Sequence, residues 1–434
     1  MFPKFKKPKK LVYLDHAATT PLDSKVLRAM LPFMQKFYGN PSSLYMLGQQ
    51  GKVAVEFARQ RIAKILDCRP QEIIFTAGGT ESVNLAIFGV VRGYLARRRE
   101  NNKLPAPHII TSTIEHHAVL NSFKALENED VEADYITVDQ QGFVDQAKLF
   151  AAIKPGTILV ILIYANNEIG TIQEISKIAH RLAKINQERQ AKNLPEILLH
   201  TDACQAAGAL DLNVHRLGAD LISLNASKIY GPKQAGLLYK RARVQIRPLI
   251  YGGGQENDLR SGTENVSGIV GFAEALELAQ KNRIKENKRL RGLRDYFARK
   301  FLNAVPDAVL NGPNPSEDSE KRPRRLPNNL SFSISGIEGE ALMLYLDPYN
   351  IAVATGSACA TAGADPSHVI LALGKSQDLA RGTIRLTLGR ENTKSNLDYA
   401  LKVMPAVIKE LRKVKTWAQS EEQHRRAAEP TRPA

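Results

Sequence analysis

The stretch "DLISLNASKIYGPKQAGLLYK" (residues 220–240) joins two short apolar runs through a polar turn. The runs, 220–226 and 235–240, have the length and composition of buried strands. The turn places Lys228 directly after the first run, where an α/β sheet presents side chains to a ligand. The amine of a lysine in such a place can hold a carbonyl cofactor as a Schiff base. The second lysine of the turn, Lys233, is expected at the surface.

Similar apolar runs recur through about the first 270 residues and alternate with segments of helical length. The other runs are 72–78, 108–113, 157–167 and 196–203, and the helical segments are 81–97, 116–127, 174–192 and 266–284. This alternation predicts an α/β fold with a mainly parallel sheet. The strands are almost uniformly apolar, as expected when helices cover both faces of the sheet.

The character of the chain changes after about residue 284. A charged amphipathic helix and a polar, proline-rich loop (311–329) are followed by two more strands, 330–336 and 383–389, and a helix near 394–415. We therefore expect a second, smaller α+β domain. The predicted large α/β domain is 15–265, and the small domain comprises 1–14 and 266–415. The polar tail 416–434 is expected to be disordered.

Composition points to a globular protein of the cytoplasm. Apolar residues make up 43% of the 434, and no run approaches the ~18 apolar residues of a membrane span. The lysine-rich N-terminus has no apolar segment after it, so no secretory signal is expected. Three cysteines are too few for a disulfide scaffold and suit a reducing compartment.

The net charge restricts the kind of partner. Sixty Lys and Arg against 44 Asp and Glu give +16, which favours acidic partners, either protein or RNA. The alternative is a solvated basic surface with no specific use. The sequence holds no RNA-reading motif, so direct nucleic-acid binding is not expected.

Polar residues follow several of the predicted strands. Gly79 and Thr80 open a helix and would suit a phosphate, although such a turn also serves as a simple cap. His116 follows the next strand and could stack on a ring or move a proton, or it could merely begin a helix. Asn167 offers an amide to a ring oxygen or a carboxylate. Asp202 ends a buried strand and needs a partner, which a protonated pyridine nitrogen would supply.

Taken together, these residues predict a pyridoxal phosphate site. They offer a phosphate cradle, a ring stacker, an acid for the ring nitrogen and, in Lys228, an amine for a Schiff base. Cys204 lies beside Asp202 and is expected to pack in the pocket wall. No metal site is expected.

Cys359 is the cysteine best placed for chemistry. It lies in "TGSACATAG" (355–363), whose small residues suit an exposed loop that presents a thiol, whereas structural cysteines prefer apolar surroundings. Downstream, Arg385 in "TIRLTLGR" could bind a substrate carboxylate through two hydrogen bonds, although a salt bridge is its usual role.

These motifs, in this order, resemble the pyridoxal-phosphate cysteine desulfurases of the NifS/IscS type, in the class V aminotransferase family with its fold type I architecture. The resemblance runs from residue 13 to about 412 and rests on "YLDHAATTPLD", "YGNPSS", "FTAGGTESVNLAI", "IEHHAV", "NNEIGTIQEI", "HTDACQAAG", "KIYGPK", "YGGGQENDLRSGTEN", "GSACATAG" and "TIRLTLGR".

The resemblance assigns roles to individual residues. It implies that Lys228 forms the Schiff base and acts as acid and base, and that His116 stacks on the ring and takes part in catalysis. The remaining cofactor contacts are implied at Gly79, Thr80, Asn167, Asp202, Gln205, Asn225 and Ser227. Thr263 would reach the phosphate of a neighbouring subunit, which implies a homodimer.

The resemblance also implies the reaction. Asn167 and Arg385, together with Asn40, would bind the carboxylate of L-cysteine. Cys359 would take the sulfur as a persulfide, leave L-alanine, and serve at most as a transient iron–sulfur ligand. The interval 360–384 resembles the branch that hands sulfur directly to an acceptor, such as an iron–sulfur scaffold protein or a tRNA-thiolation enzyme.

One stretch departs from the family pattern. Before the lysine, Ser-Gly/Ala-His is usual, whereas this chain has Asn225-Ala226-Ser227. The amide and the hydroxyl can still donate to a phosphate, but no imidazole stands beside the lysine. The alternatives to a desulfurase are therefore a selenocysteine lyase or another class V enzyme, and a weakly active sulfur carrier or scaffold.

Overall fold

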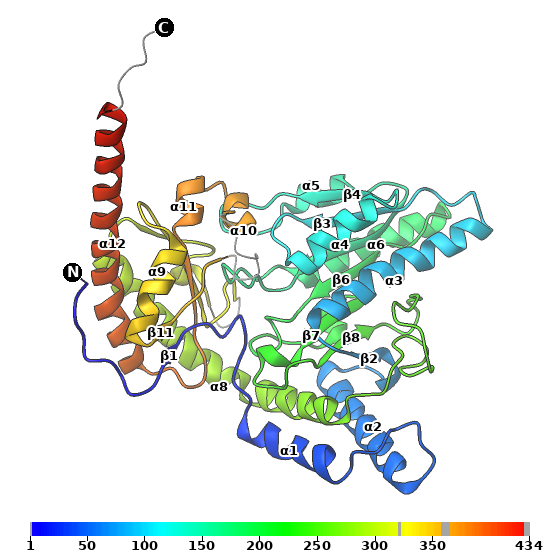
Figure 1. Cartoon of the computed structure of the whole chain (residues 1–434). Coiled ribbons are helices and arrows are strands. Elements are labelled where there is room, and N and C mark those ends of the chain that lie inside the picture. Colours follow the sequence, from blue (N-terminus) through cyan, green and yellow to red (C-terminus); the bar gives the residue numbers. More distant parts are fainter. Residues whose placement is uncertain (1, 320–322, 357–364, 429–434) are drawn as a thin grey trace.

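The computed structural model describes residues 2–319, 323–356 and 365–428, with side chains described as far as residue 413. The larger of its sheets has seven strands in the order β2-β8-β7-β6-β5-β3-β4 (Figure 1). Its strands are β2 (Ile73–Thr76), β3 (His108–Ser112), β4 (Glu132–Ile136), β5 (Thr157–Ile163), β6 (Leu198–Asp202), β7 (Leu221–Asn225) and β8 (Gly236–Lys240). Only β8 runs antiparallel to its neighbours, so the predicted, mainly parallel α/β fold is confirmed.

Both faces of this sheet are buried, because alternate residues of each strand enter different cores. In β5, Val160 and Leu162 pack in one core, whereas Leu159 and Ile161 pack in the other. The first core also takes residues from α1 (Ser24–Gln35), α2 (Met46–Leu66), α6 (Ile175–Ala191) and α7 (Val214–Leu217), and the second from α3 (Gly79–Glu100) and α4 (His117–Glu127). The remaining helix of this part is α5 (Gln146–Ala151).

The small domain has a core of its own. Its antiparallel sheet, in the order β12-β10-β9, comprises β9 (Ala308–Leu310), β10 (Asn329–Ile334) and β12 (Thr383–Thr387). A parallel pair, β1 (Val12–Tyr13) and β11 (Ile351–Ala352), joins the N-terminal segment to it. The helices are α9 (Gly339–Leu346), α10 (His368–Ala372), α11 (Gln377–Arg381) and α12 (Lys394–Ala428).

Helix α8 (Val266–Ala304) connects the two domains (Figure 1). Its first half, including Phe272, packs in a core of the large sheet, and its second half, including Phe297, packs in the small-domain core. The change of core therefore lies inside α8 rather than at residue 265, the expected boundary. The expected helix 266–284 and the charged helix after it are one continuous element.

One expectation about a polar segment differs from the structure. Residues 416–428, expected to be disordered, continue α12, because this stretch is rich in Ala, Glu, Gln and Arg and holds no Gly or Pro; 429–434 lie outside the described residues. The polar loop 311–329 is attached to α8 through Asp318, which is buried against Arg294. No helix among the described residues has the length and apolar character needed to cross a membrane.

Candidate active site

A cavity of about 310 Å³ opens at the carboxyl ends of β5, β6 and β7, between the two domains. Nine of the predicted site residues line it: Gly79, Thr80, His116, Asn167, Asp202, Gln205, Asn225, Lys228 and Arg385. They come from separate parts of the chain and meet because parallel strands end at one edge of the sheet. Cys204 also lies in its wall, as expected.

Lys228 is held by the N-terminal segment. Its Nζ donates to the carbonyl oxygens of Ala17 (2.8 Å) and Ala18 (2.7 Å). Gln205 Nε2 donates to the Ala17 carbonyl as well, at 2.9 Å. The segment that follows β1 thus positions both the amine and the amide at the cavity. Lys233, by contrast, is exposed, as the sequence predicted.

The start of α3 faces the cavity with its backbone N–H groups. Its N-cap, Gly78, offers no side-chain cap and has φ 154° and ψ −179°, a conformation open essentially only to glycine. A Cβ on Gly79 would lie 2.6 Å from Cys204 Sγ, so only a glycine fits against the β6 end. An anion placed there would meet the orphan N–H groups and the positive end of a long helix.

Asn225 organises the turn before the lysine. Its Oδ1 accepts from Ser227 N at 3.1 Å and from Ser227 Oγ at 3.0 Å. Asn225 Nδ2, at the other end of the side-chain amide, lies near Gly79. Ser227 does not line the cavity, since its hydroxyl is turned to Asn225. Asn225, at the position where serine is usual, therefore supplies an amide that both shapes the turn and faces the start of α3.

His116 is the N-cap of α4 and is partly buried. Its Nδ1 accepts from Ala118 N at 3.1 Å, which assigns the ring proton to Nε2 in the neutral form. Burial, and less strongly the charge of Lys228, lower the pKa of His116, whereas Asp202 opposes this shift. The neutral ring suits stacking on a flat heterocycle.

Asp202 is the acid of the site. It is buried at the end of β6, with Oδ1 accepting from Cys204 N at 3.0 Å. Burial and the adjacent Asp202 raise the pKa of the Cys204 thiol well above its usual range, so this thiol is not ionised. Cys204 is therefore a residue of the cavity wall and not a nucleophile.

Arg385 and Asn167 lie together at the small-domain side of the cavity. Arg385 Nη1 donates to the Asn167 carbonyl at 3.2 Å, and Nη2 donates to Asp15 Oδ1 at 2.8 Å. Arg385 Nε is buried and has no hydrogen-bond partner among the described residues. A bound carboxylate would supply the acceptor that this nitrogen lacks.

Sequence reasoning gave no role to several polar groups of the wall. Glu168 accepts from Ser367 Oγ at 2.5 Å, and burial raises its pKa to about 7. Glu115 accepts from Ser112 Oγ at 2.5 Å, and burial raises its pKa to about 8. His368 donates through Nε2 to the Glu115 carbonyl at 3.0 Å. Glu115 and Glu168 follow the same two strands as the predicted residues His116 and Asn167. This position was the only feature of the sequence that could have identified them.

Two further predicted site residues lie outside this cavity, and a third lies outside the described residues. Thr263 is exposed and lines a separate cavity beside Glu256. Asn40 is exposed in the loop between α1 and α2, where its Oδ1 accepts from Ser42 N at 3.0 Å. Cys359 lies outside the described residues, although Gly356, shortly before it, lines the main cavity.

The chemistry of the cavity fits pyridoxal phosphate. Lys228 would hold the aldehyde, Asp202 the ring nitrogen, His116 the ring face and Gln205 the phenolic oxygen. The cradle at Gly79, which a Cβ would fill, would hold the phosphate together with the start of α3. The donor set matches each polar group of the cofactor with an oppositely polarised partner.

Comparison with known proteins agrees with this geometry. Residues 12–400 match the family model of the class-V aminotransferases. The chain is 46% identical to the cysteine desulfurase IscS of Dictyoglomus turgidum, over 95% of this chain and 98% of that protein. It is 44% identical to the cysteine desulfurase IscS of Clostridium botulinum, over 93% of this chain and 96% of that protein.

A solved structure of a NifS-like protein has the same fold. It is 36% identical, gives a TM-score of 0.82, and the match covers 92% of this chain and 100% of that chain. The chain therefore belongs to the class-V aminotransferase family, and within it to the cysteine desulfurases of the NifS/IscS type.

Proposed function

We propose that this chain is a pyridoxal-phosphate-dependent L-cysteine desulfurase. The observation that carries the proposal is the single cavity in which an amine, a buried acid, a stacking histidine and an arginine with an unpartnered Nε meet. The carbon–sulfur bond of L-cysteine breaks and a sulfur–sulfur bond forms on Cys359, giving L-alanine and a persulfide. When bound, the cofactor supplies an electron sink for negative charge at the substrate α-carbon.

The residues of this chain would bind and orient the substrate and move its protons. Arg385 Nε and the Asn167 amide are the groups proposed to take the substrate carboxylate. Lys228, whose amine is held by two carbonyls, would serve as the acid and base. His116, neutral and with its proton on Nε2, is the stacking residue and a further proton donor.

The test is turnover of L-cysteine by the purified holoenzyme. Alanine should accumulate, and sulfide should appear when a thiol reductant is present. Cys359→Ser should keep the bound cofactor but lose both products. The matched control is Cys68→Ser, since Cys68 lies just after the end of α2, and burial raises its pKa to about 12. Full activity of Cys359→Ser would reject the assignment of the thiol.

A selenocysteine lyase is separated from this function by the same assay. A desulfurase should turn over both L-cysteine and L-selenocysteine. Turnover of selenocysteine alone, with no alanine from cysteine, would replace the proposed function by that of a lyase. A chain that binds no pyridoxal phosphate would instead favour the sulfur carrier or scaffold.

We also propose a homodimer in which Thr263 and Asn40 complete the partner's site. Large apolar side chains gather, exposed, around the α1–α2 loop: Met34, Tyr38, Leu44, Tyr45, Met46, Val53 and Phe57, with Tyr251 a further exposed aromatic. So much exposed apolar surface supports an interface. Mixed dimers provide the test. The Lys228→Ala and Thr263→Ala chains should each be inactive alone. A dimer that contains one chain of each variant should regain part of the activity.

The proposed sulfur acceptor is an iron–sulfur scaffold protein or a tRNA-thiolation enzyme in the cytoplasm. The net charge of +16 supports an acceptor with an acidic surface. Cys68 and Cys204 are both free thiols, which supports a reducing compartment. Transfer of labelled sulfur from Cys359 to the acceptor should slow as salt concentration rises. A salt-independent rate would remove the electrostatic argument.

A further inference from the structure

Asn329 is a buried amide that joins the small domain to the loop after β5. Its Nδ2 donates to the carbonyl of Glu168 at 3.1 Å and to that of Asn167 at 3.4 Å. The Asn167 carbonyl also accepts from Arg385 Nη1 at 3.2 Å. One carbonyl oxygen is therefore shared by Asn329 and Arg385, and the main chain of Asn167 is fixed between them.

Arg325 sets the orientation of this amide. Its Nη2 donates to Asn329 Oδ1 at 3.3 Å, and its Nε donates to the Asn329 carbonyl at 2.9 Å. A guanidinium has only donors, so it must face the oxygen end of the amide. The nitrogen end of Asn329 is then turned to the two loop carbonyls, which need a donor.

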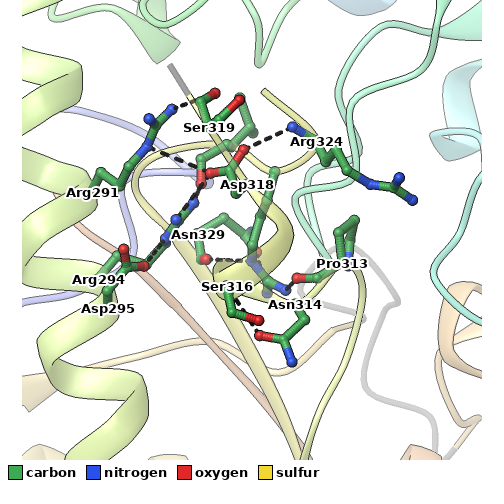
Figure 2. A network of polar contacts seen from close by, with 12 residues as sticks. Arg291, Arg294, Asp295, Pro313, Asn314, Ser316, Asp318, Ser319, Arg324 and Asn329 are labelled. Carbon is green, nitrogen blue, oxygen red and sulfur yellow. Dashed lines mark hydrogen bonds and ion pairs between the residues drawn. The ribbon is translucent and has the colours of Figure 1, made fainter. Parts of the chain in front are cut away.

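Arg325 is itself held in place by burial and by further hydrogen bonds. It is fully buried, and Nη1 donates to the carbonyls of Asn311 (2.7 Å) and Pro313 (2.9 Å). Figure 2 shows Asn329 and Pro313 in the same network of polar contacts as the ion pair of Arg294 and Asp318. Burial and the charge of Arg294 lower the pKa of Arg325 to about 9, which still leaves it protonated, with all its donors, at neutral pH.

The two segments also meet through their main chains. Leu326 N donates to the Gly170 carbonyl at 2.8 Å, and Ile172 N donates to the Arg324 carbonyl at 2.9 Å. Gly170 has φ 75°, and a Cβ on it would lie 2.8 Å from Asn329 Oδ1. The close approach that brings the Asn329 amide to the loop thus depends on a glycine at this point.

We propose that Asn329, oriented by Arg325, is a positioning residue for the carboxylate of the substrate. Asn329 does not line the cavity, and it acts by fixing the main chain of Asn167, and through the shared carbonyl the guanidinium of Arg385. The inference rests on the proposed function, in which Asn167 and Arg385 bind that carboxylate.

The test is Asn329→Asp in the holoenzyme, with ligand binding measured by calorimetry. The substitution keeps the shape of the side chain but turns an oxygen toward the loop carbonyls. One probe is 3-mercaptopropionate, which has the carboxylate and thiol of cysteine but no amine. The other is cysteamine, which has the amine and thiol but no carboxylate. The Kd of 3-mercaptopropionate should rise about tenfold, the scale of one lost hydrogen bond to a charged group, while that of cysteamine stays unchanged.

The matched control is Asn311→Asp, in the same network. The Asn311 side chain is also a buried amide, but it donates to Ser331 Oγ (3.2 Å) and Ser333 Oγ (2.9 Å) rather than to the carbonyls of Asn167 and Glu168. Both probes should bind this variant as they bind the wild type. Equal weakening of both probes by Asn329→Asp, or of neither, would overturn the proposal.

Two further measurements keep the result decisive. Asn329→Ser, which is shorter and loses the donors, serves if the Asp variant does not fold, and it should show the same selective loss. Arg325→Lys should also weaken 3-mercaptopropionate selectively, because one amine cannot satisfy the same acceptors; a normal Kd would remove Arg325 from the proposal. A wild-type enzyme without L-cysteine turnover would reject the proposed function, whereas the binding comparison would still decide the role of Asn329.

Discussion

The guanidinium of Arg385 on β12 is ion-paired with the carboxylate of Asp15, at 2.8 Å, and the main chain of Asp15 is bridged to Thr387 at the end of the same strand. The arginine side chain is 3% exposed and the aspartate 17%, so the pair is largely shielded from water. Asp15 thus offsets the charge of Arg385. Without Asp15, this guanidinium, which the site needs, would be buried with no carboxylate partner at this contact.

Asp15→Asn should therefore destabilise the fold. Removal of one partner leaves a buried charge less well compensated, and we expect the free energy of unfolding to fall by about 2 kcal/mol, less than for a fully buried pair because Asp15 is partly exposed. Chemical denaturation of the apoprotein measures this directly. An unchanged midpoint would mean that Glu168 compensates the charge alone; burial raises the pKa of Glu168 to about 7, and Arg385 partly opposes this rise.

Gly79→Ala should weaken cofactor binding because the added methyl group would clash with Cys204. The new methyl group would lie 2.6 Å from Cys204 Sγ, and the start of α3 would have to shift. We expect the Kd of pyridoxal phosphate to rise at least about tenfold, in line with the cost of overpacking a close site. The double variant Gly79→Ala/Cys204→Ala removes the clash and should recover most of the affinity. A double variant as weak as the single one would show that the methyl group itself blocks the phosphate.

Asn225 and Ser227 should differ in their importance for the cofactor. Asn225→Asp places a negative charge near the start of α3, and the Kd of pyridoxal phosphate should rise at least about tenfold. Ser227→Ala removes a hydroxyl that is turned to Asn225, and the Kd should change by less than about threefold. Absorbance titration of the apoenzyme measures both. A larger effect at Ser227 would show that its hydroxyl turns to the phosphate on binding.

Glu115 should make stability fall as pH rises. Burial raises its folded pKa from 4.5 to about 8, so the folded state holds a proton that the unfolded state has released. The stability is then fully present below about pH 4.5 and is lost progressively as pH rises toward 8. Glu115→Gln still accepts from Ser112 but does not titrate. Between about pH 5 and pH 8 the wild type should lose more than about 1 kcal/mol relative to this variant. Parallel pH profiles would place the folded pKa near its ordinary value.

The sheet was predictable because its strands carry a strong local signal. The uniformly apolar β5 and β7 were found, whereas β4 was missed, since Glu132–Ile136 is an edge strand with mostly polar or half-buried side chains. The full length of α8 was also missed. This helix passes from one core to the other through a charged middle segment, and a prediction from composition alone places a domain boundary at such a change.

The site was predictable where one side chain follows one strand. Asp202 and Lys228 were found in this way, and both line the same cavity. The carbonyls of Ala17 and Ala18 that hold the lysine could not be found, because main-chain atoms leave no mark on residue type. Asn329 is far from Asn167 in the chain, and only the packing of the small domain brings them together.

The path of α8 through both cores bears on how a ligand reaches the cavity. At 39 residues the helix is about 60 Å long, and each half is buried in a different domain. A hinge between the domains would have to bend this rod, at the expense of its internal hydrogen bonds. Any change in the distance between the large-domain side of the cavity, at Lys228, and its small-domain side, at Arg385, would therefore have to strain α8.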